Sequence, residues 1–221
     1  MTYSARSAIV CTTIVVISAG AARAQTPAAS SIPPHKLALE VTAAATLGHT
    51  SDKSFGGEAD YSFRPRLDFF VEGAHIGNAA TSDLESRARE IGDAVGASTS
   101  AVERVNFLDF GARYRVGTFK FNPYVALGVG FAQVKTSTTF SQNGQTVSPE
   151  SLGIQLGSDL SGTHTRPFVM AAVGGTAPFA KRYFVDFGYR YGHAFKETED
   201  SDLVLAGVNT NRLQVGVGIY F

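Results

Sequence analysis

The final segment of the chain, Leu213 to Phe221, carries an apolar side chain at every odd position. Successive side chains of a β-strand point to opposite faces, so this pattern predicts a strand with one apolar face. The same alternation recurs in five further segments, near residues 37–43, 67–72, 108–116, 125–132 and 183–191. No segment after residue 24 has the 18 consecutive apolar residues of a membrane-spanning helix. The repeated two-residue period therefore favours an all-β protein.

Two weaker segments bring the expected number of strands to eight, near residues 37–48, 57–64, 67–77, 104–116, 121–136, 166–177, 183–195 and 210–221. The expected connections alternate in length. Those at 65–66, 117–120 and 178–182 are short and contain Pro or Gly, whereas 49–56, 78–103, 137–165 and 196–209 are long and mostly polar. This layout is typical of an eight-stranded antiparallel up-and-down transmembrane β-barrel with short periplasmic turns and long extracellular loops. Ten strands remain an alternative, because 137–165 is long enough to contain a hairpin.

The alternation does not by itself say which face is inside, because a soluble eight-stranded barrel has the opposite polarity. The polar face of the expected strands is rich in small residues, among them Gly128, Gly130, Gly216 and Gly218. Glycine is a poor choice for a solvated strand face but fits the narrow interior of a small barrel. We therefore expect the apolar face to meet lipid and the polar face to line the lumen.

With that orientation, the inward face carries acidic and basic side chains in similar number. The predicted lumen charge network is Glu40, Arg64, Asp68, Glu72, Asp109, Arg113, Arg115, Asp186 and Arg190, with Asp60 on the same face. A charge in a narrow lumen is costly unless it has a partner or water, so we expect cross-strand ion pairs, for example between Glu40 and Arg64. Such a network acts either as a plug that stiffens the barrel or as the lining of a narrow gated pore.

The first 24 residues have the parts of a secretory signal peptide. Arg6 precedes a short apolar run, which ends at Ala22-Arg23-Ala24. We expect cleavage before Gln25, a short periplasmic lead at 25–36 and a barrel domain at 37–221. The only cysteine, Cys11, lies in the apolar run, so disulfides and thiolate chemistry are not expected in the exported chain.

Composition and residue spacing argue against several functions. The 19 basic residues balance the 19 acidic ones, so no basic surface indicates nucleic acid. The five histidines lack the spacings typical of metal sites, and we expect no metal, no cofactor and no catalysis. Within the loop at 78–103, Ser82-Asp83-Leu84-Glu85 resembles a capping box and is followed by apolar residues at helical spacing, which predicts a short amphipathic helix at the barrel mouth.

Three stretches resemble a known superfamily. Asp186-Phe187-Gly188-Tyr189-Arg190-Tyr191 is similar to its D-x-G-Y-R-Y motif, and Pro123-Tyr124-Val125 begins a segment similar to its P-Y-V-x-x-G-x-G strand. The third is the alternating C-terminal set Leu213, Val215, Val217, Ile219 and Phe221. The superfamily is that of the small outer-membrane β-barrels of Gram-negative bacteria, the OmpA-like and Opa-like "porin family" domains.

This resemblance implies export to the cell outer membrane and contact with the lipid bilayer and lipopolysaccharide. It also implies that the barrel-assembly machinery reads the C-terminal strand. It does not imply one activity, because members serve as scaffolds, adhesins or small pores. The leading hypothesis is an envelope structural and surface-interaction protein, adhesin-like and without catalysis, whose long loops contact a host or envelope partner. The alternative is a narrow porin-like channel for ions or small solutes.

Overall fold

The computed structural model describes residues 36–116, 121–157, 160–195 and 207–221. The predicted signal peptide, most of the predicted lead, the turn at 117–120 and most of the loop at 196–209 lie outside these residues. The strands are β1 (Leu37–Thr46), β2 (Lys53–Arg64), β3 (Leu67–Ile76), β4 (Ser98–Arg115), β5 (Asn122–Gln142), β6 (Gln145–Val147), β7 (Gly162–Pro178), β8 (Tyr183–Phe195) and β9 (Gly207–Tyr220). The helices are α1 (Ser82–Ala94) and the short 3-10 helix η1 (Pro149–Leu152).

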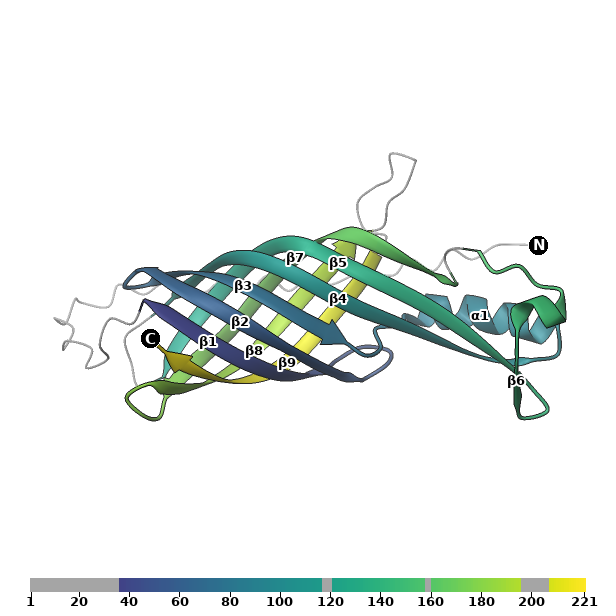
Figure 1. Ribbon diagram of the computed structural model, residues 1–221, viewed down its shortest axis with the longest axis horizontal. Helices are drawn as coiled ribbons and strands as arrows, with labels where there is room; N and C mark the ends of the chain where they lie inside the picture. Colours follow the sequence, from purple (N-terminus) through teal and green to yellow (C-terminus); the bar gives the residue numbers. More distant parts are fainter. Residues whose placement is uncertain (1–35, 117–120, 158–159, 196–206) are drawn as a thin grey trace, which may run out of the picture.

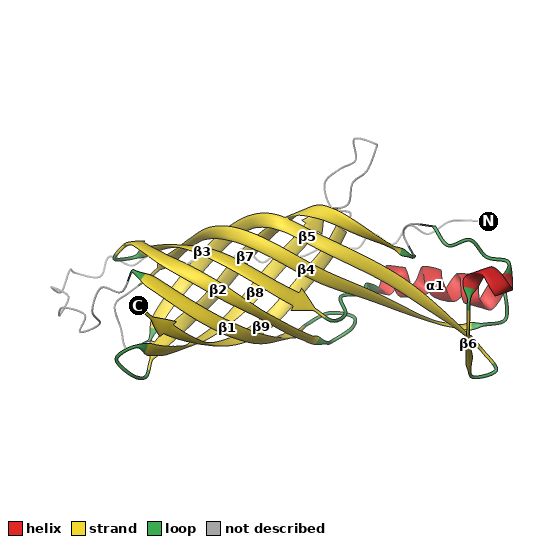
Figure 2. Ribbon diagram, in the orientation of Figure 1, coloured by secondary structure: helices red, strands yellow, loops and turns green. Residues whose placement is uncertain are grey.

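Eight of these strands close into a ring. Each strand of the series β1, β2, β3, β4, β5, β7, β8, β9 pairs antiparallel with the next, and β9 returns to pair with β1. Figures 1 and 2 show the resulting barrel of tilted strands, with β6 and α1 beyond one end. The prediction of an eight-stranded antiparallel up-and-down barrel is confirmed.

The two faces of the strands differ as the alternation predicts. Leu39, Val41, Leu127 and Val217 are among the large apolar side chains that point outward and are 45–71 % exposed. The opposite face is buried and holds the charged side chains together with aromatic residues such as Phe70 and Phe168. No helix of the described residues is long and apolar enough to cross a membrane. An apolar outer surface around a polar interior is the arrangement of a barrel surrounded by lipid.

Four strands are clearly longer than the sequence predicts. β2 begins at residue 53 rather than 57, β4 at 98 rather than 104 and β7 at 162 rather than 166, while β5 continues to 142 rather than 136. β4 and β5 pair without interruption from Ser98↔Ser141 to Arg115↔Tyr124, whereas β3 ends opposite Val105. The excess forms a two-stranded ribbon, residues 98–104 and 135–141, which projects past the end of β3. Cross-strand pairing joins the facing backbone groups of the two strands, and residues 140–141 of β5 also pair with β6.

Helix α1 packs against this ribbon. Its N-cap is Thr81, whose hydroxyl accepts a hydrogen bond from the Leu84 backbone N–H at 3.3 Å. The predicted helix is therefore present, but its cap lies one residue before the predicted Ser82, because the Thr81 backbone is extended and places its hydroxyl over the first turn. Ala88 of the helix, Ala101 of β4 and Leu160 form a small buried cluster that joins the helix to the ribbon.

Candidate functional site

The centre of the lumen is crossed by a network of buried ion pairs. The Arg190 guanidinium on β8 donates to Glu58 at 2.7 Å and to Glu72 at 2.6 Å. Arg212 on β9 donates to the other oxygen of Glu72 at 3.0 Å, and Arg113 on β4 donates to Glu58. All five side chains are at most 2 % exposed. Each of the two glutamates is therefore shared by two arginines.

This network joins opposite walls of the barrel. In the ring of eight strands, β8 lies four positions from β3, so Arg190 reaches Glu72 across the full width of the lumen. Arg212 on β9 and Glu72 on β3 are also separated by two intervening strands. Because side chains from facing walls meet, the network closes the lumen at this level.

Aromatic rings complete the closed layer. The Arg113 guanidinium lies 4.3 Å from the centre of the Tyr124 ring, and the Arg212 guanidinium lies 4.5 Å from that of Phe107. Such contacts stabilise a cation that has little water around it. The Tyr124 hydroxyl in turn donates to Asp186 at 2.9 Å. The closed layer thus combines ion pairs with cation–π contacts.

A second set of charges lies nearer the ends of β3 and β4 that carry the short turns. Arg115 pairs with Asp68 at 2.7 Å, and the Ser62 hydroxyl donates to the other oxygen of Asp68 at 2.7 Å. Arg113 reaches Asp60 at 3.2 Å. Arg115 is more exposed than the arginines of the central network, at 24 %, and marks the edge of the lumen.

The structure places every predicted lumen residue in the interior except Arg64. This side chain is exposed, with its guanidinium 5.5 Å from the centre of the Phe63 ring, so the predicted lumen position of Arg64 and its pairing with Glu40 are wrong. The pairing of β2 with β3 shifts register between Ser62 and Arg64, and this irregularity changes the face that Arg64 presents.

Sequence reasoning also missed two members of the network, Glu58 and Arg212. Glu58 lies two residues before Asp60 and therefore on the same strand face. Arg212 likewise lies two residues before Gln214, on the inward face of β9. In both cases, extension of the alternation by one step toward the N-terminus would have included the residue.

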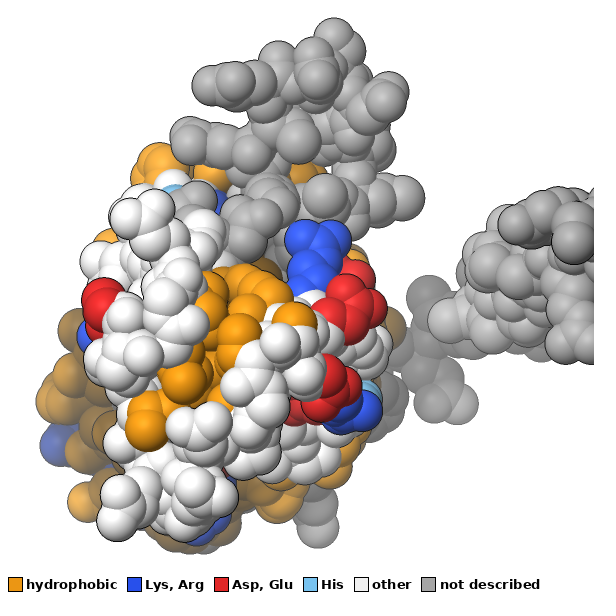
Figure 3. All heavy atoms as spheres, turned by 90° about the vertical axis from the view of Figure 1, so that its right-hand side faces the viewer, with side chains coloured by type: hydrophobic (Ala, Val, Ile, Leu, Met, Phe, Trp, Pro, Cys, Tyr) orange, Lys and Arg blue, Asp and Glu red, His pale blue; other side chains and the backbone are white. Residues whose placement is uncertain are grey.

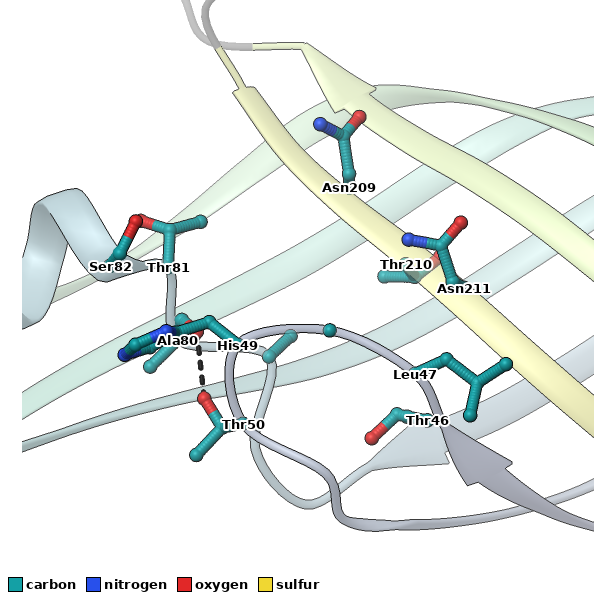
Figure 4. Close-up of a pocket in the computed structure, with 12 residues that line it drawn as sticks. Thr46, Leu47, His49, Thr50, Ala80, Thr81, Ser82, Asn209, Thr210 and Asn211 are labelled. Atoms are coloured by element: carbon teal, nitrogen blue, oxygen red, sulfur yellow. Dashed lines mark hydrogen bonds between the residues drawn. The ribbon is translucent and has the colours of Figure 1, made fainter.

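A pocket of about 180 Å³ opens at the end of the barrel that carries the long loops. Figure 4 shows that its lining comes from the β1–β2 loop, the start of α1 and the strand β9. The Thr50 hydroxyl donates to the Ala80 carbonyl at 2.8 Å, and His49 contacts Glu85 at 2.9 Å. These contacts attach the β1–β2 loop to the helix segment and shape one wall of the pocket.

The described part of the outer end is formed by the ribbon, α1, residues 145–157 and Leu160. Figure 3 looks onto this end and shows hydrophobic side chains gathered near its centre, with acidic and basic side chains along one edge. Leu152, Ile154 and Leu156 are partly exposed, and Leu156 packs against the cluster beneath α1. The described part of the outer end thus presents both apolar and charged side chains.

The buried histidine near this end does not contact an acid among the described residues. His193 is 6 % exposed, and its Nδ1 lies 2.7 Å from the Asn209 side-chain oxygen. The same oxygen accepts a hydrogen bond from the Tyr191 hydroxyl at 2.8 Å. An amide partner orients the imidazole but does not supply the carboxylate that would assist a catalytic base. The acidic residues at 199, 200 and 202 lie outside the described residues.

A closed eight-stranded barrel with an apolar outer belt and an ion-paired lumen defines the class of outer-membrane β-barrel proteins. The family model described as "Outer membrane protein beta-barrel domain" matches residues 10–221, so the chain belongs to this family and is embedded in a lipid bilayer. The predicted family resemblance is confirmed. No curated protein sequence matches the chain.

Solved structures of the same fold are similar to this chain at low sequence identity. Neisserial surface protein A is 14% identical, with a TM-score of 0.51, and the match covers 84% of this chain and 96% of that protein. The N-terminal β-barrel domain of Pseudomonas aeruginosa OprF is 14% identical, with a TM-score of 0.48 and coverages of 83% and 97%. A major outer membrane protein from Thermus thermophilus is 11% identical, with a TM-score of 0.49 and coverages of 85% and 100%.

Proposed function

We propose that the protein is a structural and surface-interaction protein of the outer membrane, adhesin-like and without a catalytic step. The observation that carries the proposal is the ordered ribbon. Seven residues of β4 continue beyond the end of β3, a length of about 23 Å at the usual rise per residue. A barrel that served as an anchor alone would gain nothing from so long an ordered extension, whereas a binding surface needs a rigid support.

The alternative, a narrow channel for ions or small solutes, has weaker support. The lumen carries the charged side chains that a selective channel would need. However, Arg190 and Glu72 meet from opposite walls and leave no continuous passage at their level. Conduction would require these ion pairs to separate in a lumen that is closed to water. We therefore propose that the lumen network stabilises the barrel and that recognition takes place at the outer end.

Excision of the outer end is expected to abolish binding without unfolding the barrel. The chain offers two natural junctions: the Ala79 N–H donates to the Glu103 carbonyl at 2.7 Å, and Thr136 pairs directly with Gly162. Residues 80–102 and 137–161 can therefore be replaced by short Asn-Gly turns. Bacteria that display the full protein and the excised form are compared for adherence to cultured epithelial cells and to immobilised extracellular-matrix proteins.

The control for this comparison is Lys181→Ser, an exposed change at the rim with the short turns. Folding of each form is followed by the shift in gel mobility that folded barrels show on heating. Adherence that falls to the level of cells without the protein supports the proposal. Equal adherence of the folded excised form and the full protein would place recognition elsewhere.

A second proposal concerns assembly. The side chain of Phe221 is 59 % exposed beyond the end of β9, and its N–H donates to the Leu37 carbonyl at 2.8 Å. We propose that Phe221, with the outward residues Leu213, Val215, Val217 and Ile219, is recognised by the barrel-assembly machinery. Phe221→Ala is expected to slow insertion in cells and to change the free energy of unfolding of the inserted barrel little. Pulse-chase labelling measures the insertion rate, and urea titration measures the free energy of unfolding. An unchanged insertion rate would refute the proposal.

A further inference from the structure

Three acidic side chains meet inside the barrel on β1 and β2. Glu40 and Glu58 are direct register partners on adjacent strands, and Asp60 lies two residues further on the same face of β2. Oxygen atoms of the three carboxylates lie within 4.8 Å of one another. Like charges on directly opposed residues destabilise a sheet, so this arrangement calls for a positive charge among them.

The arginines of the lumen do not supply that charge to all three. Arg113 contacts Glu58 and Asp60, and Arg190 contacts Glu58. Glu40 is only 4 % exposed, and neither of its carboxylate oxygens has a hydrogen-bond partner among the described residues. A buried carboxylate without a partner is costly, and here it is directed at two other carboxylates.

The sum of the charges in the described lumen independently shows that its arginines are too few to balance its acids. Near the ribbon, the buried Glu103 interacts with Arg166, and these two charges balance. The other acidic side chains are Glu40, Glu58, Asp60, Asp68, Glu72, Asp109 and Asp186, and the other basic ones are Arg113, Arg115, Arg190 and Arg212. Seven carboxylates against four arginines leave three negative charges if all are ionised. A narrow interior that excludes water does not tolerate such an excess without bound cations or protons.

The strand next to Glu40 leaves space for its carboxylate. Glu40 is paired with Gly218 on β9, and Gly216 precedes Gly218 on the same inward face. A Cβ atom added at Gly216 would lie 2.6 Å from the Glu40 carboxyl carbon. The glycine thus leaves room for the Glu40 carboxylate in its present position, beside the other two acids.

We propose that Glu40, Glu58 and Asp60 form a binding site for one divalent cation of the Ca²⁺ and Mg²⁺ class. The donors are all carboxylate oxygens, which hard cations prefer, and Glu40 offers both of its oxygens. Histidine and cysteine spacings in the sequence do not predict this site, because these three acids come together only through strand pairing.

The cation in this site exchanges slowly. Phe184 and Tyr220 cover the lumen on the side of Ala38, with ring centres 4.5 Å apart, and the arginine layer covers the other side. An ion enclosed between an aromatic cover and a charged layer is captured as the barrel closes and is released when these covers open. It acts as a structural ion that offsets the excess of negative charge.

The test measures metal retained by the folded protein. The full protein is purified in detergent from the membranes of expressing cells, passed over a chelating resin and analysed by elemental mass spectrometry. We expect about one Ca²⁺ or Mg²⁺ per barrel. Glu40→Gln, which keeps the side-chain shape, is expected to reduce the metal to background.

A second measurement follows thermal unfolding. The protein is unfolded with chelator and refolded with added Ca²⁺ or Mg²⁺. The midpoint of thermal unfolding should rise with metal in the unaltered protein and not in Glu40→Gln.

Asp109→Asn is the matched control. Asp109 is also buried and has two unpartnered oxygens, but it lies on β4 outside the cluster, so this variant should retain the metal. Equal loss of metal from both variants would indicate diffuse counter-ions and overturn the proposal. The proposal is also overturned if the unaltered protein holds no metal and its midpoint of thermal unfolding does not depend on metal. Infrared spectroscopy can detect a protonated carboxyl group. If such a band is present and disappears in Glu40→Gln, a proton and not a cation neutralises Glu40, and the proposal is overturned.

Discussion

Replacement of Arg190 by methionine is expected to lower the free energy of unfolding of the barrel by about 3–5 kcal/mol. The change removes the cation that Glu58 and Glu72 share and leaves both glutamates buried with one arginine each. Methionine keeps an unbranched side chain in place of the aliphatic stem of arginine and removes the guanidinium, so the loss reports mainly the uncompensated charge. Urea titration of the protein refolded in lipid vesicles measures the change.

Arg115→Met is the control for this variant. Arg115 also has a buried carboxylate partner, Asp68, but it is 24 % exposed and its site is open to solvent at the lumen edge. Arg115→Met should therefore lower the free energy of unfolding clearly less than Arg190→Met. If both variants lose the same stability, the central network is no more important than an edge ion pair, and the interpretation of Arg190 as the central link of the network fails.

Introduction of arginine at Val217 is expected to lower the free energy of unfolding by about 2–4 kcal/mol, because the site faces the middle of the bilayer. Val217 is 49 % exposed on the outer surface. It pairs with Val41, which lies midway along β1, and with Val185 on β8. A charge at this depth would have to leave water for hydrocarbon.

The matched variant is Thr146→Arg, on the exposed strand β6 beyond the barrel. It adds the same charge in water and should change stability little. Both variants are compared by urea titration in vesicles of the same lipid. A tolerated arginine at Val217 would mean that this surface does not contact the bilayer core.

The parts of the fold that the sequence predicts are those where one strand face meets lipid. In β1, β3, β8 and β9 the physical demand for an apolar outer face produces strict alternation, and the expected strand ends lie within three residues of the observed ones. The ribbon formed by β4 and β5 lacks this alternation, because its exposed face carries polar residues such as Lys135, Ser137 and Thr139. Its Ser and Thr residues resemble a loop, and only the cross-strand pairing reveals a strand.

The charge network also shows what the sequence pattern leaves undetermined, namely which side chains meet across the barrel. The inward position of Asp68, Asp109 and Arg190 follows from the two-residue period together with the small residues that mark the lumen face. The partners do not, because Arg190 pairs with residues on strands that lie three and four positions away in the ring. Register irregularities are equally invisible in a single sequence, and one of them placed Arg64 outside the lumen. Strand period predicts the face, whereas closure of the ring determines the pairs.

The pairing of β1 with β9 has a consequence for the order of events in folding. Leu39 lies opposite Ile219, so the seam joins the first and last strands of the barrel and closes almost the whole chain into one loop. The conformational entropy lost in joining distant segments is highest for such a contact, and topologies of this kind fold slowly. A barrel that lacked β9 would present β1 and β8 as two unpaired edges. The nascent polypeptide therefore depends on being held apart from other chains during its passage to the membrane.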